Sequence, residues 1–194
     1  GGPPRIAPGG PPRIAPGGPP RIAPGGRRDI GLANWSMIAV GARLARAPGM
    51  PKLFTTMARH RSLFRAWLFF AGRLMPRGKL PRRETELVIL RTAWRSGCDY
   101  ELDHHRRLGQ QAGLSAEEVQ RTVTDSLEGW NARDRVLLSA ADELQRSRNL
   151  SDETWGELRR HLSERDAIEF LLLAGHYAML ATFINTLRIG SDHA

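Results

Sequence analysis

Residues 83–113 read RETELVILRTAWRSGCDYELDHHRRLGQQAG and contain the clearest evidence for the fold. Apolar residues recur at helical spacing before Gly97 and again after it, which predicts helices over 81–95 and 98–112. Gly97 and Gly113 end the two segments, because glycine readily adopts backbone conformations that stop a helix. A turn as tight as the one at Gly97 predicts that the second helix folds back antiparallel to the first.

The same punctuated helical pattern continues outward from this stretch. No convincing strand with a two-residue period appears from Ile30 onward. Ser115 to Glu118 is a capping box that begins a short helix. The other expected helices span 34–46, 51–59, 61–75, 131–147, 151–162 and 164–188. The sequence therefore predicts an all-α protein with a single compact helical domain over 29–194.

The chain begins with a repeat that cannot belong to a core. Three copies of Gly-Gly-Pro-Pro-Arg-Ile-Ala-Pro are followed by Gly25 and Gly26. Proline locks φ and glycine is permissive, so the repeat opposes both helix formation and strand pairing. Residues 1–28 are therefore expected to form a disordered tail.

The basic character of the chain is concentrated at this end. The net charge at pH 7 is +9; the three repeats carry +3 and Arg27 with Arg28 carries +2, which leaves +4 for the other residues. No stripe of basic residues interleaved with aromatic residues accompanies that remainder. A nucleic-acid partner is therefore not expected.

Cysteine content and hydropathy bear on location. The single cysteine, Cys98, excludes an intrachain disulfide and fits a reducing compartment. The longest apolar run, 170–184, is interrupted by His176 and is shorter than the roughly 20 residues that a bilayer span needs. The N-terminal residues do not match a signal peptide. We therefore expect a cytoplasmic protein without a membrane partner.

Three residues after Gly97 form a constellation that could do chemistry. Cys98, Glu101 and His105 are spaced i, i+3, i+7, which places them within about a 60° arc on one helix face. Cys98 lies near the helix N-terminus, where the dipole is expected to lower the pKa of the thiol and make it reactive. Glu86, one helix earlier, can reach His105 across the antiparallel turn. The alternative is a solvated Glu101–His105 pair beside a thiol that only packs.

Residues 83–113 closely resemble the core of the carboxymuconolactone decarboxylase and alkylhydroperoxidase D superfamily. The shared features are a glutamate-initiated apolar helix, a Gly-Cys turn, and an acidic, aromatic helix that ends in histidine and glycine. The later segments RDRVLLSAADEL, LSDETWGELRRHL and EFLLLAGHYAMLATFINTL resemble the longer bacterial members, so the likeness extends over about 30–190. The resemblance implies an all-helical fold, a homo-oligomer (trimer or hexamer), and a site at or near subunit contacts.

The redox branch of the superfamily uses a Cys-x-x-Cys pair with an upstream glutamate and a downstream histidine. Glu86, Cys98 and His105 match three of those positions, but Glu101 stands where the resolving cysteine would be. Without that second thiol the chain cannot form the internal disulfide of the redox cycle. Peroxidase activity would then need an external thiol to resolve Cys98.

The decarboxylase branch needs a base, an acid and stabilisation of an enolate-like oxyanion. The resemblance implies His105 as the acid/base, Glu86 as its orienting partner and Glu101 as a second acid. The expected partner is a small-molecule substrate, an enolisable carboxylic acid or lactone, and no cofactor is expected. This lyase-like activity is the preferred interpretation; a one-cysteine peroxidase and a non-catalytic oligomeric binding protein remain the alternatives.

Four further residues are candidates for substrate binding. Arg91 or Arg106 could hold a substrate carboxylate through two hydrogen bonds. His176 and Tyr177 interrupt an apolar helix, where buried polar groups need partners, and could form the far wall of a pocket.

A metal site is the remaining alternative. Glu101-Leu-Asp-His104 matches the Glu-x-x-His element of di-iron bundles, but those sites need a second such element, which the sequence lacks. No metal is expected, and His104 is expected at the surface or at an interface.

Overall fold

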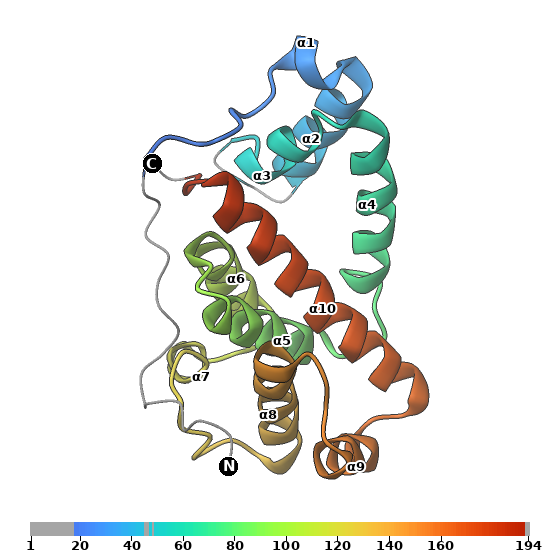
Figure 1. Ribbon diagram of the computed structural model, residues 1–194, viewed down its shortest axis with the longest axis vertical. Coiled ribbons are helices and arrows are strands. Elements are labelled where there is room, and N and C mark those ends of the chain that lie inside the picture. The colour runs from blue at the N-terminus through green and yellow to red at the C-terminus, as the bar shows by residue number, and fades with distance from the viewer. Residues whose placement is uncertain (1–17, 45–46, 48, 193–194) are drawn as a thin grey trace, which may run out of the picture.

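The computed structural model describes residues 18–44, 47 and 49–192, and these residues form ten helices and no strand (Figure 1). The helices are α1 (Arg27–Ile30), α2 (Leu32–Leu44), α3 (Lys52–Met57), α4 (Arg61–Leu74), α5 (Arg82–Arg95), α6 (Asp99–Gln111), α7 (Ala116–Arg121), α8 (Ala132–Ser147), α9 (Asp152–His161) and α10 (Glu164–Leu187). The predicted all-α class is confirmed. Apart from α1, each helix was expected, and its ends lie close to those predicted.

Two helices organise the domain. The long helix α10 runs diagonally across it, with α4 on one side and α5, α6 and α8 on the other (Figure 1). α5 packs against α6, α8 and α10, and its ten consecutive residues from Glu84 to Ala93 are buried. The largest apolar cluster lies between α5, α8 and α10 and includes Val88, Leu137 and Phe170. Because α5 is surrounded, each of its polar side chains needs a partner inside the domain.

Local capping explains the ends of several helices. Gly97 has φ 59°, a left-handed conformation that favours glycine, and the following Cys98 N–H donates to the carbonyl oxygen of Ala93 at 3.0 Å. The chain therefore reverses between α5 and α6, as predicted. The capping box at Ser115 is also confirmed, because the Ser115 and Glu118 side chains each accept from the other residue's backbone N–H, at 3.0 and 2.7 Å.

The N-terminal segment differs from the prediction of a tail over 1–28. Residues 1–17 lie outside the described residues, but 18–28 lie along the domain. The Arg21 N–H donates to the carbonyl oxygen of Leu187 at 3.0 Å. Composition does not reveal such long-range backbone contacts.

Gly25 shows how closely this segment approaches the domain. Its N–H donates to the carbonyl oxygen of Thr55 at 3.1 Å. A Cβ at this position would lie 2.5 Å from Cγ2 of Ile30 and 2.8 Å from the Thr55 oxygen. Only glycine fits such an approach, so this residue serves a packing role in the described structure.

By length and composition alone, one described helix, α10, could cross a membrane: its most apolar window has a mean hydropathy of 1.7. Half of that window is buried inside the domain. A core helix meets the same criteria, so this feature is weak evidence for a membrane span.

Candidate functional site

The centre of the candidate site is a histidine between two carboxylates. His105 Nδ1 lies 2.6 Å from Oε2 of Glu86, and His105 Nε2 lies 3.3 Å from Oε2 of Glu101. The three residues are at most 5% exposed. The structure thus brings together the acid/base group expected from the sequence and places it between α5 and α6.

Two local features position this group. Glu101 and His105 are one helical turn apart, so their side chains lie on the same face of α6. Gly109, one turn further on, allows α6 to approach α5 closely: a Cβ there would lie 3.3 Å from Cδ1 of Leu90 and 3.7 Å from Cβ of Glu86. A Cβ at this position would therefore crowd Leu90 and also Leu114, whose Cδ1 would lie 3.1 Å away, while its contact with Glu86 would be an ordinary one.

Arg82 completes the cluster and was missed by the sequence analysis. Its Nη2 lies 2.5 Å from Oε1 of Glu86, and its side chain is 37% exposed. Its Nη1 is buried and has no hydrogen-bond partner among the described residues. The i, i+4 spacing of Arg82 and Glu86 on a predicted helix was the signal that could have found it.

The two carboxylates keep His105 charged. Burial by itself lowers the pKa of His105, but hydrogen bonds to Glu101 and Glu86 and their negative charges outweigh it and raise the pKa to about 9. At neutral pH the ring is therefore an imidazolium that donates from both nitrogens. With Arg82 beside Glu86, two positive charges balance two carboxylates.

The prediction of a reactive Cys98 with a lowered pKa is wrong. Cys98 is fully buried, and this burial, followed by the negative charge of Glu101, raises the pKa of the thiol to about 12. Backbone N–H groups of residues 100 and 101 lower the pKa, as expected at a helix N-terminus, but do not offset the increase. The thiol is neutral at physiological pH and lacks the thiolate that nucleophilic chemistry requires.

His176 and Tyr177 of α10 both border the cluster. The Tyr177 ring meets the His105 ring edge-on, with centroids 5.1 Å apart and planes at 88°. His176 lies next to Tyr177 and stacks on Trp67 of α4, with centroids 5.8 Å apart. Burial lowers the pKa of His176, which favours the neutral ring, and its Nδ1 is buried without a hydrogen-bond partner in the described part of the chain. Trp67 was not identified as a site residue from the sequence.

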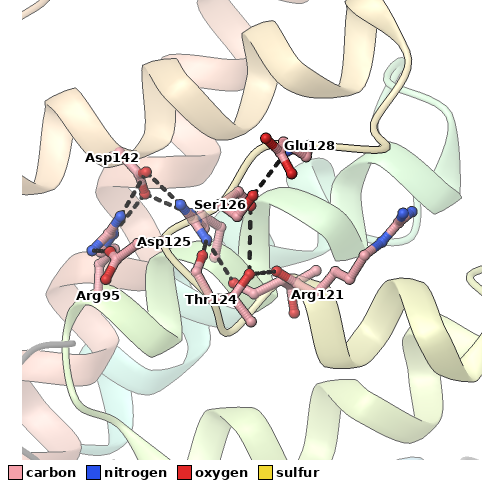
Figure 2. A network of polar contacts seen from close by, with 9 residues as sticks. Arg95, Arg121, Thr124, Asp125, Ser126, Glu128 and Asp142 are labelled. Atoms are coloured by element: carbon pink, nitrogen blue, oxygen red, sulfur yellow. Dashed lines mark hydrogen bonds and ion pairs between the residues drawn. The ribbon is translucent and has the colours of Figure 1, made fainter. Parts of the chain in front are cut away.

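Arg91 does not line this site, contrary to the prediction. Its guanidinium is fully buried and donates to both carboxylate oxygens of Asp142 at 2.6 Å. It also lies over the ring of Trp94, 4.7 Å from the centroid. Figure 2 shows Asp142 binding Arg95 as well, so this carboxylate joins α5 to α8. The guanidinium of Arg91 thus binds groups of the domain itself, Asp142 and the carbonyl oxygen of Thr122, so Arg91 has a structural role.

Arg106 is also separated from the cluster. It forms an ion pair with Asp103 at 3.7 Å, and both side chains are at least 40% exposed. Adjacent residues on a helix point about 100° apart, which directs Arg106 away from His105. The predicted role of Arg106 in substrate binding is therefore not supported by its position.

The Glu-x-x-His element does not converge on one point. Glu101 contacts His105, whereas His104 Nε2 lies 3.1 Å from Asp192 near the C-terminus. His104 is partly buried and stacks on Tyr100, so it joins α6 to the C-terminal residues. Among the described residues, no group of three or more His, Cys, Asp or Glu side chains is placed to hold a metal ion.

The helical fold and the site geometry agree with a match to a known family. Residues 61–143, which include the whole of α5 and α6, match the carboxymuconolactone decarboxylase family. The segment 61–143 is therefore similar to this family, and the fold of the chain is similar to that of AhpD-like proteins. The resemblance seen in the sequence is thus confirmed. No curated protein sequence matches the chain.

Solved structures show that the superfamily fold extends beyond the matched segment. A peroxidase-related protein from Ralstonia eutropha with an alkylhydroperoxidase AhpD core has a TM-score of 0.76 and 18% identity, covering 88% of this chain and 93% of its own. A peroxidase-related protein from Silicibacter sp. has a TM-score of 0.75 and 17% identity, covering 82% and 85%. The debrominase Bmp8 has a TM-score of 0.75 and 17% identity, covering 88% and 91%. At these identities the likeness shows the fold alone.

Proposed function

We propose that this chain is an acid/base enzyme that decarboxylates or isomerises a small enolisable carboxylic acid or lactone. The observation that carries the proposal is the imidazolium of His105 held between the buried carboxylates of Glu86 and Glu101. Such a group can donate and accept protons in a site from which water is largely excluded.

Each residue has a distinct role in this proposal. In a decarboxylation, the bond to the departing carboxylate breaks, its electron pair passes into a conjugated carbonyl to form an enolate, and carbon dioxide leaves. The enolate carbon then takes a proton from His105, which regains one from solvent. In an isomerisation, Oε1 of Glu101, which has no hydrogen-bond partner among the described residues, accepts a proton from carbon, and His105 returns one elsewhere. Glu86 orients and charges the imidazole.

In this proposal Arg82, rather than Arg91 or Arg106, binds a carboxylate of the substrate. Its unpartnered Nη1 can bind a carboxylate that the substrate retains, and its partial exposure places it between solvent and the buried cluster. A substrate anion bound there would lie next to the Glu86–His105 pair.

A one-cysteine peroxidase receives less support. Two proteins of similar fold are described as peroxidase-related, and one from Agrobacterium tumefaciens as a putative antioxidant defence protein AhpD. In this chain, however, the only cysteine is buried and its raised pKa keeps the thiol neutral. The position of a resolving cysteine holds Glu101.

A test of the proposal is incubation of the purified protein in D₂O with a panel of unsaturated lactone carboxylates and β-keto acids. We expect carbon dioxide release or deuterium incorporation next to the carbonyl, detected by mass spectrometry, and its loss in His105→Gln. A parallel incubation with cumene hydroperoxide and dithiothreitol tests the peroxidase alternative. Thiol-dependent peroxide reduction without deuterium incorporation would contradict the proposal, and inactivity in both assays would favour a non-catalytic binding protein.

The proposed assembly is a homo-oligomer, a trimer or hexamer. Ile168, Leu172 and Met179 follow each other at helical spacing along the outer face of α10 and are 59%, 48% and 50% exposed. An apolar stripe of this kind gains stability when a second copy covers it. Light scattering at micromolar concentration is expected to give a multiple of the monomer mass, and a monomer would contradict this prediction.

A cytoplasmic location is also proposed, since the unpaired Cys98 fits a reducing compartment.

A further inference from the structure

The hydroxyl group of Tyr177 has a poor partner for a buried donor. Its hydrogen bond in the described structure goes to the thioether sulfur of Met75 at 3.7 Å, and thioethers are weak acceptors. Tyr100, the other tyrosine of the chain, instead donates to a carboxylate oxygen of Asp192 at 2.8 Å. A buried hydroxyl with so weak an acceptor can exchange it for a stronger one at little cost.

The position of Tyr177 relates this hydroxyl to the proposed acid/base group. Its ring contacts that of His105 edge-on at 5.1 Å. Burial raises the pKa of Tyr177 well above its ordinary value, and the charges of Glu101 and Glu86 raise it further, against a smaller opposing effect of Arg82. The phenol therefore remains a neutral donor at any working pH.

The surroundings of Tyr177 contain an unusual number of unsatisfied polar atoms. Five buried atoms without a hydrogen-bond partner in the described structure belong to its neighbours or to residues of the same cluster: Arg82 Nη1, Glu86 Oε1, Glu101 Oε1, His176 Nδ1 and Trp67 Nε1. Of these, Glu86 Oε1 still has the ion pair with Arg82. Buried polar groups are normally paired, so such a concentration indicates a place where a polar ligand completes the bonding.

We propose that Tyr177 is a catalytic residue that donates a hydrogen bond to the substrate oxygen that becomes negative as the enolate forms. The inference deepens the proposed function and rests on it. As the electron pair moves into the carbonyl, the hydroxyl leaves Met75 and binds the developing oxyanion, while its proton stays on the tyrosine. Glu86 and Glu101 repel a third negative charge, and His105 and Arg82 already balance these two carboxylates, so the oxyanion needs a further hydrogen-bond donor. The substrate class is accordingly a carboxylic acid or lactone whose carbonyl is conjugated with the reacting carbon.

The kinetic test compares Tyr177→Phe with the matched control Tyr100→Phe. Tyr177→Phe is expected to lower kcat by about 10²-fold, with little change in KM, because the lost hydrogen bond strengthens only in the transition state. The pH dependence due to His105 is expected to persist. Tyr100→Phe removes a hydrogen bond to Asp192 and is expected to leave kcat within about threefold of the wild type. Equal kcat in Tyr177→Phe and wild type would overturn the inference.

A binding test separates this inference from the proposed function, because it needs no turnover. 4-Nitrophenolate carries a phenolate oxyanion on a planar ring, with its charge partly shared with the nitro group, and 4-nitroaniline is a neutral compound of similar shape. Wild type is expected to bind the phenolate at least about tenfold more tightly than Tyr177→Phe does, as measured by the absorbance of the bound ion, with equal binding of the aniline. If phenolate binding depends on Tyr177 but no acid is turned over, the oxyanion site is supported and only the proposed reaction is refuted. Phenolate binding unaffected by Tyr177→Phe, or absent from the wild type, would refute the oxyanion site.

Discussion

Replacing His105 by glutamine is expected to lower kcat by about 10²-fold or more, whereas Cys98→Ser is expected to change it only modestly. His105 is the group between the two buried carboxylates, and its loss removes the proton donor. Cys98 is a buried neutral thiol, and serine preserves nearly its size. Glu86→Gln should resemble the His105 variant, because an amide cannot hold the imidazole in its charged form.

The pH dependence follows from the raised pKa of His105. Reactions that need the imidazolium are expected to slow as the pH rises through about 9, the pKa of His105 in the folded protein. The same shift stabilises the fold: because the folded pKa lies above the ordinary value of 6.5, the stabilisation is complete below 6.5 and is lost as the pH rises through about 9. A pH–rate profile and urea unfolding at pH 6 and pH 10 measure the two effects.

Peroxidase chemistry predicts the reverse order of effects. Cys98→Ser would then abolish activity, and peroxide treatment of the wild type would give a sulfenic acid at Cys98 that an added thiol restores. Circular dichroism of each variant serves as the control for folding. Finding that reversed order would reject the acid/base assignment.

Replacing Asp142 by alanine is expected to destabilise the fold by about 3–5 kcal/mol, because it leaves a buried charge without its partner. Arg91 is fully buried and relies on Asp142 for two hydrogen bonds at 2.6 Å, while Arg95 donates to the same carboxylate (Figure 2). Urea denaturation monitored by tryptophan fluorescence measures the loss. The carboxylate also connects α5 to α8, so we expect these two helices to separate at a lower urea concentration in the variant.

Asp125→Ala is the matched control. Asp125 forms an ion pair with the same Arg95 but its side chain is 52% exposed, so we expect a loss below about 1 kcal/mol. Similar losses in the two variants would show that burial of Arg91 does not set the effect.

Acid unfolding gives a second readout of the Asp142 network. Burial alone would raise the pKa of Asp142, but hydrogen bonds from Arg95 and Arg91 lower it below its ordinary value of 3.8. A depressed folded pKa contributes stability above the ordinary value, and that contribution is lost as the pH falls through the folded pKa. Lowering the pH below about 4 should therefore destabilise the wild type more than Asp142→Ala.

Features that depend on neighbouring residues could be predicted from the sequence. Helical periodicity, the Ser115 capping box and the stop at Gly97 are local properties, and they predicted the all-α class and the reversal between α5 and α6. The i, i+4 spacing of Glu101 and His105, with Glu86 one helix earlier, made the acid/base group a candidate, and the resemblance to the superfamily supplied the roles of its members.

Which groups are available for chemistry depends on contacts between residues that are distant in the sequence. A helix N-terminus favours a thiolate, but complete burial beside Glu101 reverses the effect for Cys98. The position of an arginine in the sequence does not show whether its donors are paired. Arg91 donates to Asp142, which is distant in the sequence and comes close only because α8 packs against α5, whereas Arg82 Nη1 has no partner among the described residues. Pairing, burial and pKa arise from residues that folding brings together, so these properties require the three-dimensional arrangement of the helices.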